Sequence, residues 1–304
     1  MKKYKKKLLI TIVLIIFTFF GIRLYFDNET FDITLYTATL TNDNEITIKS
    51  NKDNYILTIP NKNIYEEIKG KIILQISDLH NKEYGKNNID LLKSIDIINP
   101  DYVFLTGDMV SSEDVDFGGF YSLAKSLAEK YTCYYVPGNH ECGLSYSKYK
   151  ELLNEINKLS VINLDGKKVN LSNNVVLYGL NYDEIYYYPK NHFSVDKIEK
   201  ELGKTDNTKF NILITHDPKD FDNYCKWGAD IVFAGHTHGG MIRMFDVGII
   251  STDRTLFPKY DGGLFENTID NQNQNILVDS KGLSRGHIGF RLFNKPELVV
   301  LEFK

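Results

Sequence analysis

Cysteine is scarce in this chain of 304 residues, which holds three: Cys133, Cys142 and Cys225. Their spacing matches neither a zinc-binding nor a thioredoxin-like pattern. The odd number also argues against a disulfide framework, even in an oxidising compartment. We therefore expect small buried side chains at all three positions. Cys142 is the one that oxidation would reach if a metal site lies beside it.

Arginine is also scarce, because lysine carries most of the positive charge. Of the five arginines, Arg23 lies near the N-terminus and the other four follow residue 240: Arg243, Arg254, Arg285 and Arg291. Arginine binds a phosphate through two parallel N–H groups. The C-terminal segment is therefore expected to face a phosphorylated substrate or to brace the site. Surface ion pairing is the alternative for each arginine.

An excess of positive charge is absent as well. The chain has 36 basic and 40 acidic residues. Residues 1–26 hold six basic and no acidic residues, so the remainder has 30 basic against 40 acidic residues and a net charge of −10. Proteins that bind nucleic acid through its phosphates need a basic surface. We expect no nucleic-acid footprint, and a substrate phosphate has to be held locally by metals and a few cations.

A long apolar run begins close to the N-terminus. Five lysines between Lys2 and Lys7 precede the uncharged stretch Leu8–Ile22, which ends at Arg23. With Leu24–Phe26 added, a helix that rises about 1.5 Å per residue just crosses a hydrocarbon core of about 30 Å. Residues 1–26 are therefore expected to form a cytoplasmic basic tip and a transmembrane anchor.

Two other interpretations of this run fit less well. A cleaved signal peptide needs small residues at its exit, which here reads Gly-Ile-Arg-Leu-Tyr-Phe-Asp, and a buried core helix would not be apolar on every face. Lysines precede the run and few follow it, which by the positive-inside rule places the N-terminus in the cytoplasm. The prediction is a single-pass protein of the cell membrane with an extracytoplasmic catalytic domain.

The remainder of the chain reads as strands and helices. Residues 27–69 alternate apolar and polar positions, as in FDITLYTATL and NYILTIP, and predict three short strands that form a membrane-proximal lead-in or extra strands of a sheet. Residues 70–304 alternate strands with amphipathic helices, for which 87–99, 120–131 and 146–159 are candidates. This alternation indicates an α/β fold.

Five short polar blocks carry most of the histidines. They are Asp78-Leu79-His80, Gly107-Asp108, Gly138-Asn139-His140, Thr215-His216-Asp217 and Gly235-His236-Thr237-His238-Gly239-Gly240. Each block follows a run that is typical of a buried strand, such as KIILQIS before Asp78. The polar side chains are therefore expected where loops converge on one rim of a sheet. Carboxylate, amide and imidazole groups together suit Zn, Mn or Fe, so the blocks predict a two-metal site.

The order D-x-H, G-D, G-N-H-E, H and G-H-x-H resembles the calcineurin-like metallophosphoesterase superfamily over residues 70–304. The segments GGMIRMF, RTLFPKYDGGLF and KGLSRGHIGFRLFNKPELVVLEF are similar to its envelope-associated bacterial branch of phosphodiesterases and UDP-2,3-diacylglucosamine pyrophosphatase-like hydrolases. The resemblance implies a four-layer α/β/β/α sandwich of two mixed sheets.

Carried over block by block, the resemblance implies two divalent ions, which would be Mn, Zn or Fe. One ion would be held by Asp78, His80, Asp108 and His238, and the other by Asp108, Asn139, His216 and His236. The carboxylate of Asp108 has two oxygens and would bridge ions about 3.5–4 Å apart that share a hydroxide. That hydroxide is the expected nucleophile, which makes Asp108 a catalytic residue as well as a ligand.

His140 follows the amide ligand Asn139 directly, and both are expected to lie beside the substrate. His140 would stabilise the transferring phosphoryl oxygens or protonate the leaving group, and would not bind a metal. A minor role in orienting His140 falls to Glu141. Arg243 matches a basic position of the family and is the expected phosphate anchor.

Other residues receive weaker interpretations. The aromatic segment Asn181–Phe193 would cap a nucleotide base or a lipid tail, or pack against the sheet, and packing is preferred. His192 and His287 lie outside the blocks and are read as ordinary, with His287 the better placed to line the pocket.

Together these features predict a membrane-anchored binuclear phosphoesterase. Its substrate would be a phosphodiester or pyrophosphate of the envelope, either a phosphorylated small molecule or a lipid-linked one. One alternative is a non-catalytic envelope-binding protein that retains the fold, which the complete set of ligands argues against. A second is a phosphomonoesterase or phosphoprotein phosphatase, which the outward topology disfavours.

Overall fold

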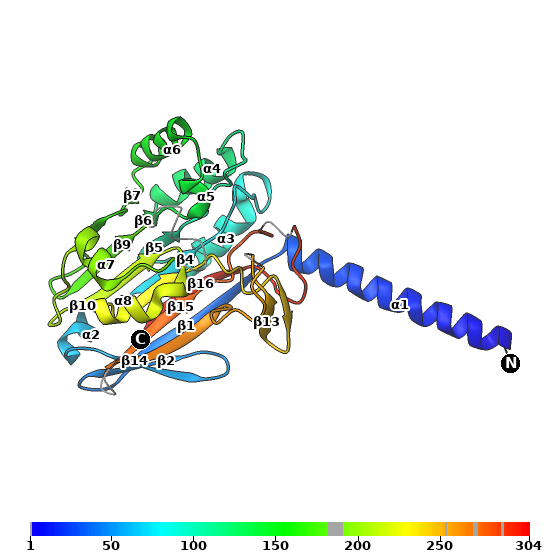
Figure 1. Ribbon diagram of the computed structural model, residues 1–304, viewed down its shortest axis with the longest axis horizontal. Coiled ribbons are helices and arrows are strands. Elements are labelled where there is room, and N and C mark those ends of the chain that lie inside the picture. Colours follow the sequence, from blue (N-terminus) through cyan, green and yellow to red (C-terminus); the bar gives the residue numbers. More distant parts are fainter. Residues whose placement is uncertain (1, 182–190, 253, 270–272, 287–288) are drawn as a thin grey trace.

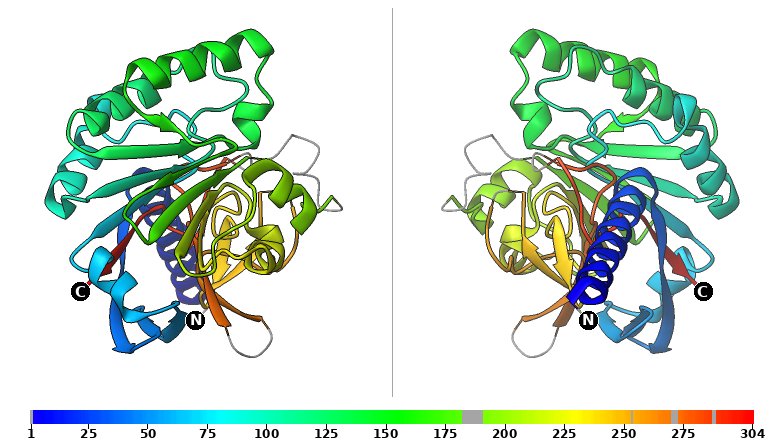
Figure 2. Two further views of the ribbon diagram at one scale, coloured as in Figure 1. Left: turned by 90° about the vertical axis from the view of Figure 1, so that its left-hand side faces the viewer. Right: turned by 90° about the vertical axis from the view of Figure 1, so that its right-hand side faces the viewer.

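Two β-sheets lie face to face, and helices cover both outer faces (Figure 1, Figure 2). The computed structural model describes residues 2–181, 191–252, 254–269, 273–286 and 289–304. Within these ranges the larger sheet has eight strands in the order β3 (Asn54–Thr58), β2 (Glu45–Lys49), β1 (Asp32–Asn42), β16 (Glu297–Phe303), β4 (Ile72–Ile76), β5 (Tyr102–Thr106), β6 (Thr132–Val136) and β7 (Ile162–Asn163). Strands β4 to β7 run parallel, and β16 is antiparallel to β4, so the sheet is mixed.

The smaller sheet is parallel in its middle and antiparallel at both edges. Its six described strands follow the order β14 (Gly263–Ile269), β15 (Asn273–Asp279), β11 (Ile231–Ala234), β10 (Phe210–Thr215), β9 (Val175–Leu180) and β8 (Lys167–Asn170). A separate hairpin pairs β12 (Ile242–Met244) with β13 (Val247–Ile250). This hairpin follows the last histidine block directly.

The helices divide between the two outer faces. Helices α3 (Ile89–Ile98), α4 (Gly118–Ala128) and α6 (Tyr146–Lys158) cover the larger sheet, and α7 (Val195–Leu202) and α8 (Phe221–Trp227) cover the smaller one. There are also two short helices. Helix α2 (Lys62–Ile68) lies at the edge of the sandwich, and helix α5 (Asn139–Cys142) follows β6. The helices predicted at 87–99, 120–131 and 146–159 are confirmed as α3, α4 and α6.

Three apolar clusters hold these layers together. The central cluster lies between the sheets, where the rings of Phe104 on β5 and Phe233 on β11 meet edge to face with 5.2 Å between their centroids. The two outer clusters join each sheet to its helices. Strand β4 shows why the central strands read as continuous apolar runs, since Ile73 packs between the sheets and Leu74 packs under the helices. The predicted four-layer α/β/β/α sandwich is confirmed.

The strands of residues 27–69 belong to the larger sheet. Strand β1 pairs in parallel with β16, from Asp32 beside Glu297 to Ala38 beside Phe303. Of the two alternatives that the sequence left open, the structure shows extra strands of the sheet. Helix α2, which buries Ile64, Tyr65 and Ile68 against the central cluster, was not anticipated.

Helix α1 (Lys2–Glu29) projects away from the sandwich (Figure 1). Within its segment Tyr4–Glu29, a window of 18 residues has a mean hydropathy of 2.4, and this window is not buried in the protein. By length and composition this helix could cross a membrane. It is therefore compatible with a single-pass anchor.

Candidate metal centre

The polar blocks follow the carboxyl ends of parallel strands in both sheets. Asp78 comes two residues after β4, Asp108 two after β5 and Asn139 three after β6, all in the larger sheet. His216 follows β10 directly, and His236 comes two residues after β11 in the smaller sheet. Parallel strands carry their following loops to one rim, and the two rims adjoin, so blocks far apart in sequence meet at one centre.

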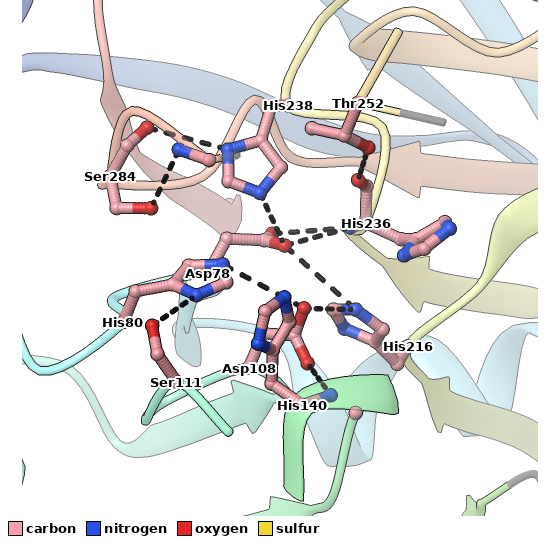
Figure 3. A network of polar contacts seen from close by, with 12 residues as sticks. Asp78, His80, Asp108, Ser111, His140, His216, His236, His238, Thr252 and Ser284 are labelled. Atoms are coloured by element: carbon pink, nitrogen blue, oxygen red, sulfur yellow. Dashed lines mark hydrogen bonds and ion pairs between the residues drawn. The ribbon is translucent and has the colours of Figure 1, made fainter. Parts of the chain in front are cut away.

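Six predicted ligands form two adjoining clusters (Figure 3). The first contains Asp78, His80 and His238, and the second contains Asp108, His216 and His236, with the ligand atoms of each cluster within 4.8 Å of one another. Nε2 of His238 lies 3.2 Å from Oδ1 of Asp78. Nε2 of His216 lies 3.1 Å from Oδ2 of Asp108 and 3.8 Å from Oδ1 of Asp78, so it links the clusters.

The backbone at five of these ligands is strained. Their φ angles are positive: 51° at Asp78, 47° at His80, 54° at Asp108, 71° at His236 and 50° at His238. For a residue with a side chain this conformation costs on the order of 1–3 kcal/mol and persists only where the surroundings enforce it. Such strain concentrates at functional sites. Here it turns the side chains of both sheets toward one point.

Buried atoms without partners indicate that the centre fits cations. Nε2 of His80 and Oδ1 of Asn139 are buried and have no hydrogen-bond partner among the described residues. The carboxylates of Asp78 and Asp108 are buried within a few ångströms of His80. Leaving such lone pairs unsatisfied is costly, and a divalent cation satisfies lone pairs and carboxylate charge together. The donor set therefore fits divalent metal ions.

Outer hydrogen bonds fix the orientation of the imidazoles. Nδ1 of His216 donates to the carbonyl oxygen of Thr106 at 2.8 Å, so Nε2 faces the centre. Nδ1 of His80 lies 3.0 Å from Oγ of Ser111, and burial lowers the pKa of His80 to about 3, which keeps its ring neutral. An imidazole held through one nitrogen can bind a metal through the other once that nitrogen carries no proton.

In the metal-free protein, the negative charge of the two aspartates favours protonation of His216. Burial lowers the pKa of His216, but the carboxylates of Asp108 and Asp78 outweigh it and raise that pKa to about 10. His216 is therefore protonated at pH 7 in the metal-free protein. Metal ligation requires the neutral ring, so a metal must displace this proton.

Metal binding is accordingly expected to release about one proton from His216 at pH 7, and affinity should rise with pH until the pKa of His216 is passed. Titration calorimetry of the metal-free protein in two buffers with different ionisation enthalpies measures the released protons. Binding enthalpies that do not depend on the buffer would contradict this assignment.

His140 lies at the edge of the centre and lines a cavity. Its backbone N–H donates to Oδ1 of Asp108 at 2.8 Å, and its Nδ1 accepts the N–H of Ser112 at 3.2 Å. In the neutral ring the proton therefore sits on Nε2. Gly138 lies so close that a Cβ there would collide with Oδ1 of Asp108. The G-N-H block thus holds the ring of His140 beside the predicted ligand Asp108.

Glu141 has a different partner from the one expected. Its carboxylate accepts the backbone N–H groups of Gly138, Asp108, Met109 and Val110, the first three at 2.7–2.9 Å and the last at 3.3 Å. It thereby ties the loop after β5 to the loop after β6. The sequence suggested that Glu141 orients His140, whereas the structure shows that it anchors the loop that carries Asp108.

Replacing Glu141 with glutamine is expected to lower the free energy of unfolding by about 1–3 kcal/mol, because an amide cannot accept all four N–H groups and leaves buried donors unsatisfied. Thermal unfolding with and without excess Mn²⁺ measures the effect. The loss should be larger with metal if the Asp108 loop is displaced, and a variant as stable as the parent would contradict this role.

Two of the four C-terminal arginines, Arg243 and Arg291, brace the segments around the centre. Arg291 is fully buried and donates to the carbonyl oxygens of Ser284 and His238, at 2.6 and 3.2 Å. The guanidinium of Arg243 donates to the carbonyl oxygens of Gly239, Asp261 and Asp246. Of the two roles that the sequence left open, these contacts are bracing ones. The phosphate-anchor role of Arg243 stays a prediction, and its donors already have carbonyl partners.

Two cavities flank the ligands. The larger, of about 580 Å³, is lined by His80, His140, Lys82 and Arg285, among others. The smaller, of about 200 Å³, borders His236 on the other side and includes Lys219, Lys259 and Tyr260. Burial lowers the pKa of Lys82 to about 8, so it is still mostly cationic at pH 7. Each cavity thus offers cations beside the metal ligands.

The remaining predictions concern the aromatic segment, two histidines and the cysteines. Residues 182–190 of the aromatic segment, and His287, lie outside the described residues. His192 is paired with Asp220 at 2.7 Å. No disulfide joins the three cysteines. Burial raises the pKa of Cys142 to about 12. That thiol therefore stays protonated and poorly reactive.

Comparison with known proteins places the chain in a single family. The family described as calcineurin-like phosphoesterase matches residues 72–240. A metallophosphoesterase of Campylobacter jejuni is 27% identical over 76% of this chain, and one of Aquifex aeolicus is 27% identical over 76% of this chain and 84% of its own length. The matched region spans only 59% of the Campylobacter protein and 38% of a Helicobacter pylori relative. None of these matches distinguishes the UDP-2,3-diacylglucosamine branch, which stays a prediction.

Similarity to solved structures is more distant. NAD nucleotidase of Haemophilus influenzae superposes with a TM-score of 0.39 and 14% identity, over 70% of this chain and 45% of that one. The family match, which spans more than half of the chain and includes the five blocks, is what identifies this protein.

Proposed function

The chain belongs to the calcineurin-like metallophosphoesterase family, and on this premise we propose that it is a membrane-anchored phosphohydrolase that cleaves a phosphodiester or pyrophosphate bond with two divalent ions. The observation that carries the proposal is the position of Asp108. Its carboxylate belongs to the cluster with His216 and His236 and also lies in a group with His80 and His140. One carboxylate is thus placed to serve both halves of the centre.

The bound ions would supply charge for the phosphoryl oxygens and an activated water at neutral pH. Every other contribution comes from the chain. Asp78, His80 and His238 would hold one ion, and the second would be held by His216, His236 and Asn139. His140, with its proton on Nε2, is positioned to stabilise the transferring phosphoryl group or to protonate the leaving oxygen.

A diester or pyrophosphate is favoured over a monoester because cavities lie on both sides of the ligands. A phosphorus atom held at the centre would carry one substituent toward Lys82 and Arg285 and the other toward Lys219 and Lys259. A monoester would leave one of these cavities without a substituent. Recognition of both substituents is how such a site would discriminate between substrates.

Purified full-length protein with Mn²⁺ should therefore hydrolyse bis-p-nitrophenyl phosphate or a nucleotide diphosphate sugar faster than p-nitrophenyl phosphate. The comparison of kcat/KM across the three substrates tests the bond type. A clear preference for the monoester would overturn the diesterase proposal and leave the metal centre standing.

The anchor proposal has its own expected outcome. Full-length protein should stay with membranes after washing with high salt or carbonate, because an apolar helix of this length partitions into the bilayer essentially irreversibly. Protease added outside cells that lack their wall should digest the domain after α1. Recovery of a soluble mature form starting near residue 27 would show that the segment is a cleaved signal.

A further inference from the structure

The end of helix α1 is built into the wall of the larger cavity. Asp27 and Asn28 are buried, and Asn28 exchanges hydrogen bonds with the backbone of Arg291 at 2.8 and 3.0 Å. The N–H of Phe293 donates to Oδ2 of Asp27 at 2.6 Å. Glu29 lines the larger cavity and pairs with Arg285. The helix is therefore fixed relative to the cavity by hydrogen bonds at its last turn.

The spacing along α1 gives the depth of the cavity relative to a bilayer. Arg23 is the first charged residue after the apolar run and would mark the outer edge of the hydrocarbon core. Glu29 follows six residues later, which at a helical rise of about 1.5 Å per residue is roughly 9 Å farther out. The headgroup layer is about 5–8 Å thick on each side. The cavity wall at Glu29 would thus lie at the outer face of the lipid headgroups.

Exposed apolar side chains gather around the base of the same helix. We name them the apolar rim: Met244, Phe245, Val247, Leu256, Phe257, Phe290 and Phe293. They lie on the β12–β13 hairpin and on the two segments bridged to it, through Leu292 beside Ile242 and Leu256 beside Ile250. In Figure 1 the hairpin stands next to α1, on the side from which the helix leaves the domain. Phe245 at its turn is 91% exposed.

Phe293 connects the rim with the anchor. Its ring centroid lies 6.1 Å from that of Phe20, and the guanidinium carbon of Arg23 lies 5.3 Å from it. Phe20 belongs to the apolar run, so the rim reaches the depth at which α1 would enter the hydrocarbon core. Phenylalanine and leucine on apolar faces insert at the boundary between headgroups and acyl chains, and exposed apolar patches on a soluble surface call for a partner.

We propose that the apolar rim rests in the outer interface of the bilayer and holds the larger cavity against the lipid headgroups, so that the substrate is a lipid phosphodiester or pyrophosphate. The inference rests on the anchored phosphohydrolase proposed above. A bilayer is the occupant because α1 itself brings the rim to it. The contacts of Arg243 with Gly239, Asp261 and Asp246 fix the hairpin in advance, which lowers the entropic cost of docking.

Tryptophan fluorescence tests the docking without requiring turnover. Trp227, the single tryptophan of the chain, is buried, and full-length Phe245→Trp and Phe257→Trp would be placed in phosphatidylcholine vesicles with brominated acyl chains. Both added tryptophans should be quenched. Tyr146→Trp, an exposed position on α6 at the top of Figure 1, should not be. If Phe245→Trp is quenched no more than Tyr146→Trp, the docking proposal is overturned, whatever the enzyme hydrolyses.

The double variant Phe245→Asp with Phe257→Asp tests the substrate class. It should hydrolyse CDP-diacylglycerol in vesicles at least about tenfold more slowly, because charged side chains weaken interfacial binding, and bis-p-nitrophenyl phosphate at the parent rate. Tyr146→Asp, the matched control, should leave both rates unchanged. Equal rates of the double variant and the parent on the vesicle substrate, or an equal loss on both substrates, would overturn the lipid assignment. If the parent protein hydrolysed neither substrate, this result would instead count against the proposed function alone.

Discussion

Replacing Asp108 with asparagine is expected to abolish turnover and to lower the bound metal together. The carboxylate lies 3.1 Å from Nε2 of His216 and 3.7 Å from Nε2 of His80, one from each half of the centre. An amide keeps the shape but removes the negative charge that would serve both ions. Since loss of an outer-shell partner alone costs 10- to 100-fold in affinity or activity, loss of this ligand should reduce kcat/KM by more than about 100-fold.

Metal analysis of the purified variant, alongside steady-state kinetics, measures both effects. Asp43→Asn is the matched control, because the side chain of Asp43 is 85% exposed and far from the blocks in the fold. The control should retain full metal content and activity. An Asp108→Asn protein with parental metal content and parental turnover would contradict the bridging role.

Replacing His140 with alanine is expected to give the opposite combination, with the metals retained and kcat reduced by about 10²- to 10⁴-fold. The reason is the geometry of its ring, which accepts the N–H of Ser112 at Nδ1 and so keeps its proton on Nε2 for the substrate. A group that acts in the transition state changes kcat and leaves ion binding in place.

His80→Ala is the contrasting variant. Its Nε2 is buried and faces the centre without a hydrogen-bond partner, so its removal should empty one ion position. Metal content and kcat of the two variants separate ligand from proton donor. The division of roles would be wrong if His140→Ala also lost an ion. His140 is close enough to bind one, because its ligand atom lies within 4.8 Å of those of His80 and Asp108.

The clustering of the candidate ligands could be predicted from sequence because each chemical group follows a recognisable strand. Asp78, Asp108 and His216 stand directly behind buried apolar runs, and parallel strands bring such positions to one rim. The apolar runs also identify the central strands, and the amphipathic period identifies α3, α4 and α6. At these sites the strand pattern and the chemical type of the residue both indicate the same place in the fold.

The supporting residues could not be predicted in the same way. Glu141 binds four backbone N–H groups of two loops, and no local pattern reveals where those loops will pass. The bracing contacts of Arg243 and Arg291 depend on carbonyl groups exposed by irregular segments. Helices α2, α7 and α8 have seven or eight residues each, too few for a clear helical period. Their formation depends on packing against the sheets.

Anomalous diffraction from crystals grown with Mn²⁺ tests the central claim most directly, because it locates each ion among the side chains. We expect two peaks about 3.5–4 Å apart, which is the spacing of the ions in binuclear hydrolases. One should lie among Asp78, His80 and His238, the other beside His216 and His236, and both within bonding distance of Asp108. A single peak, or a peak bonded to His140, would contradict the account.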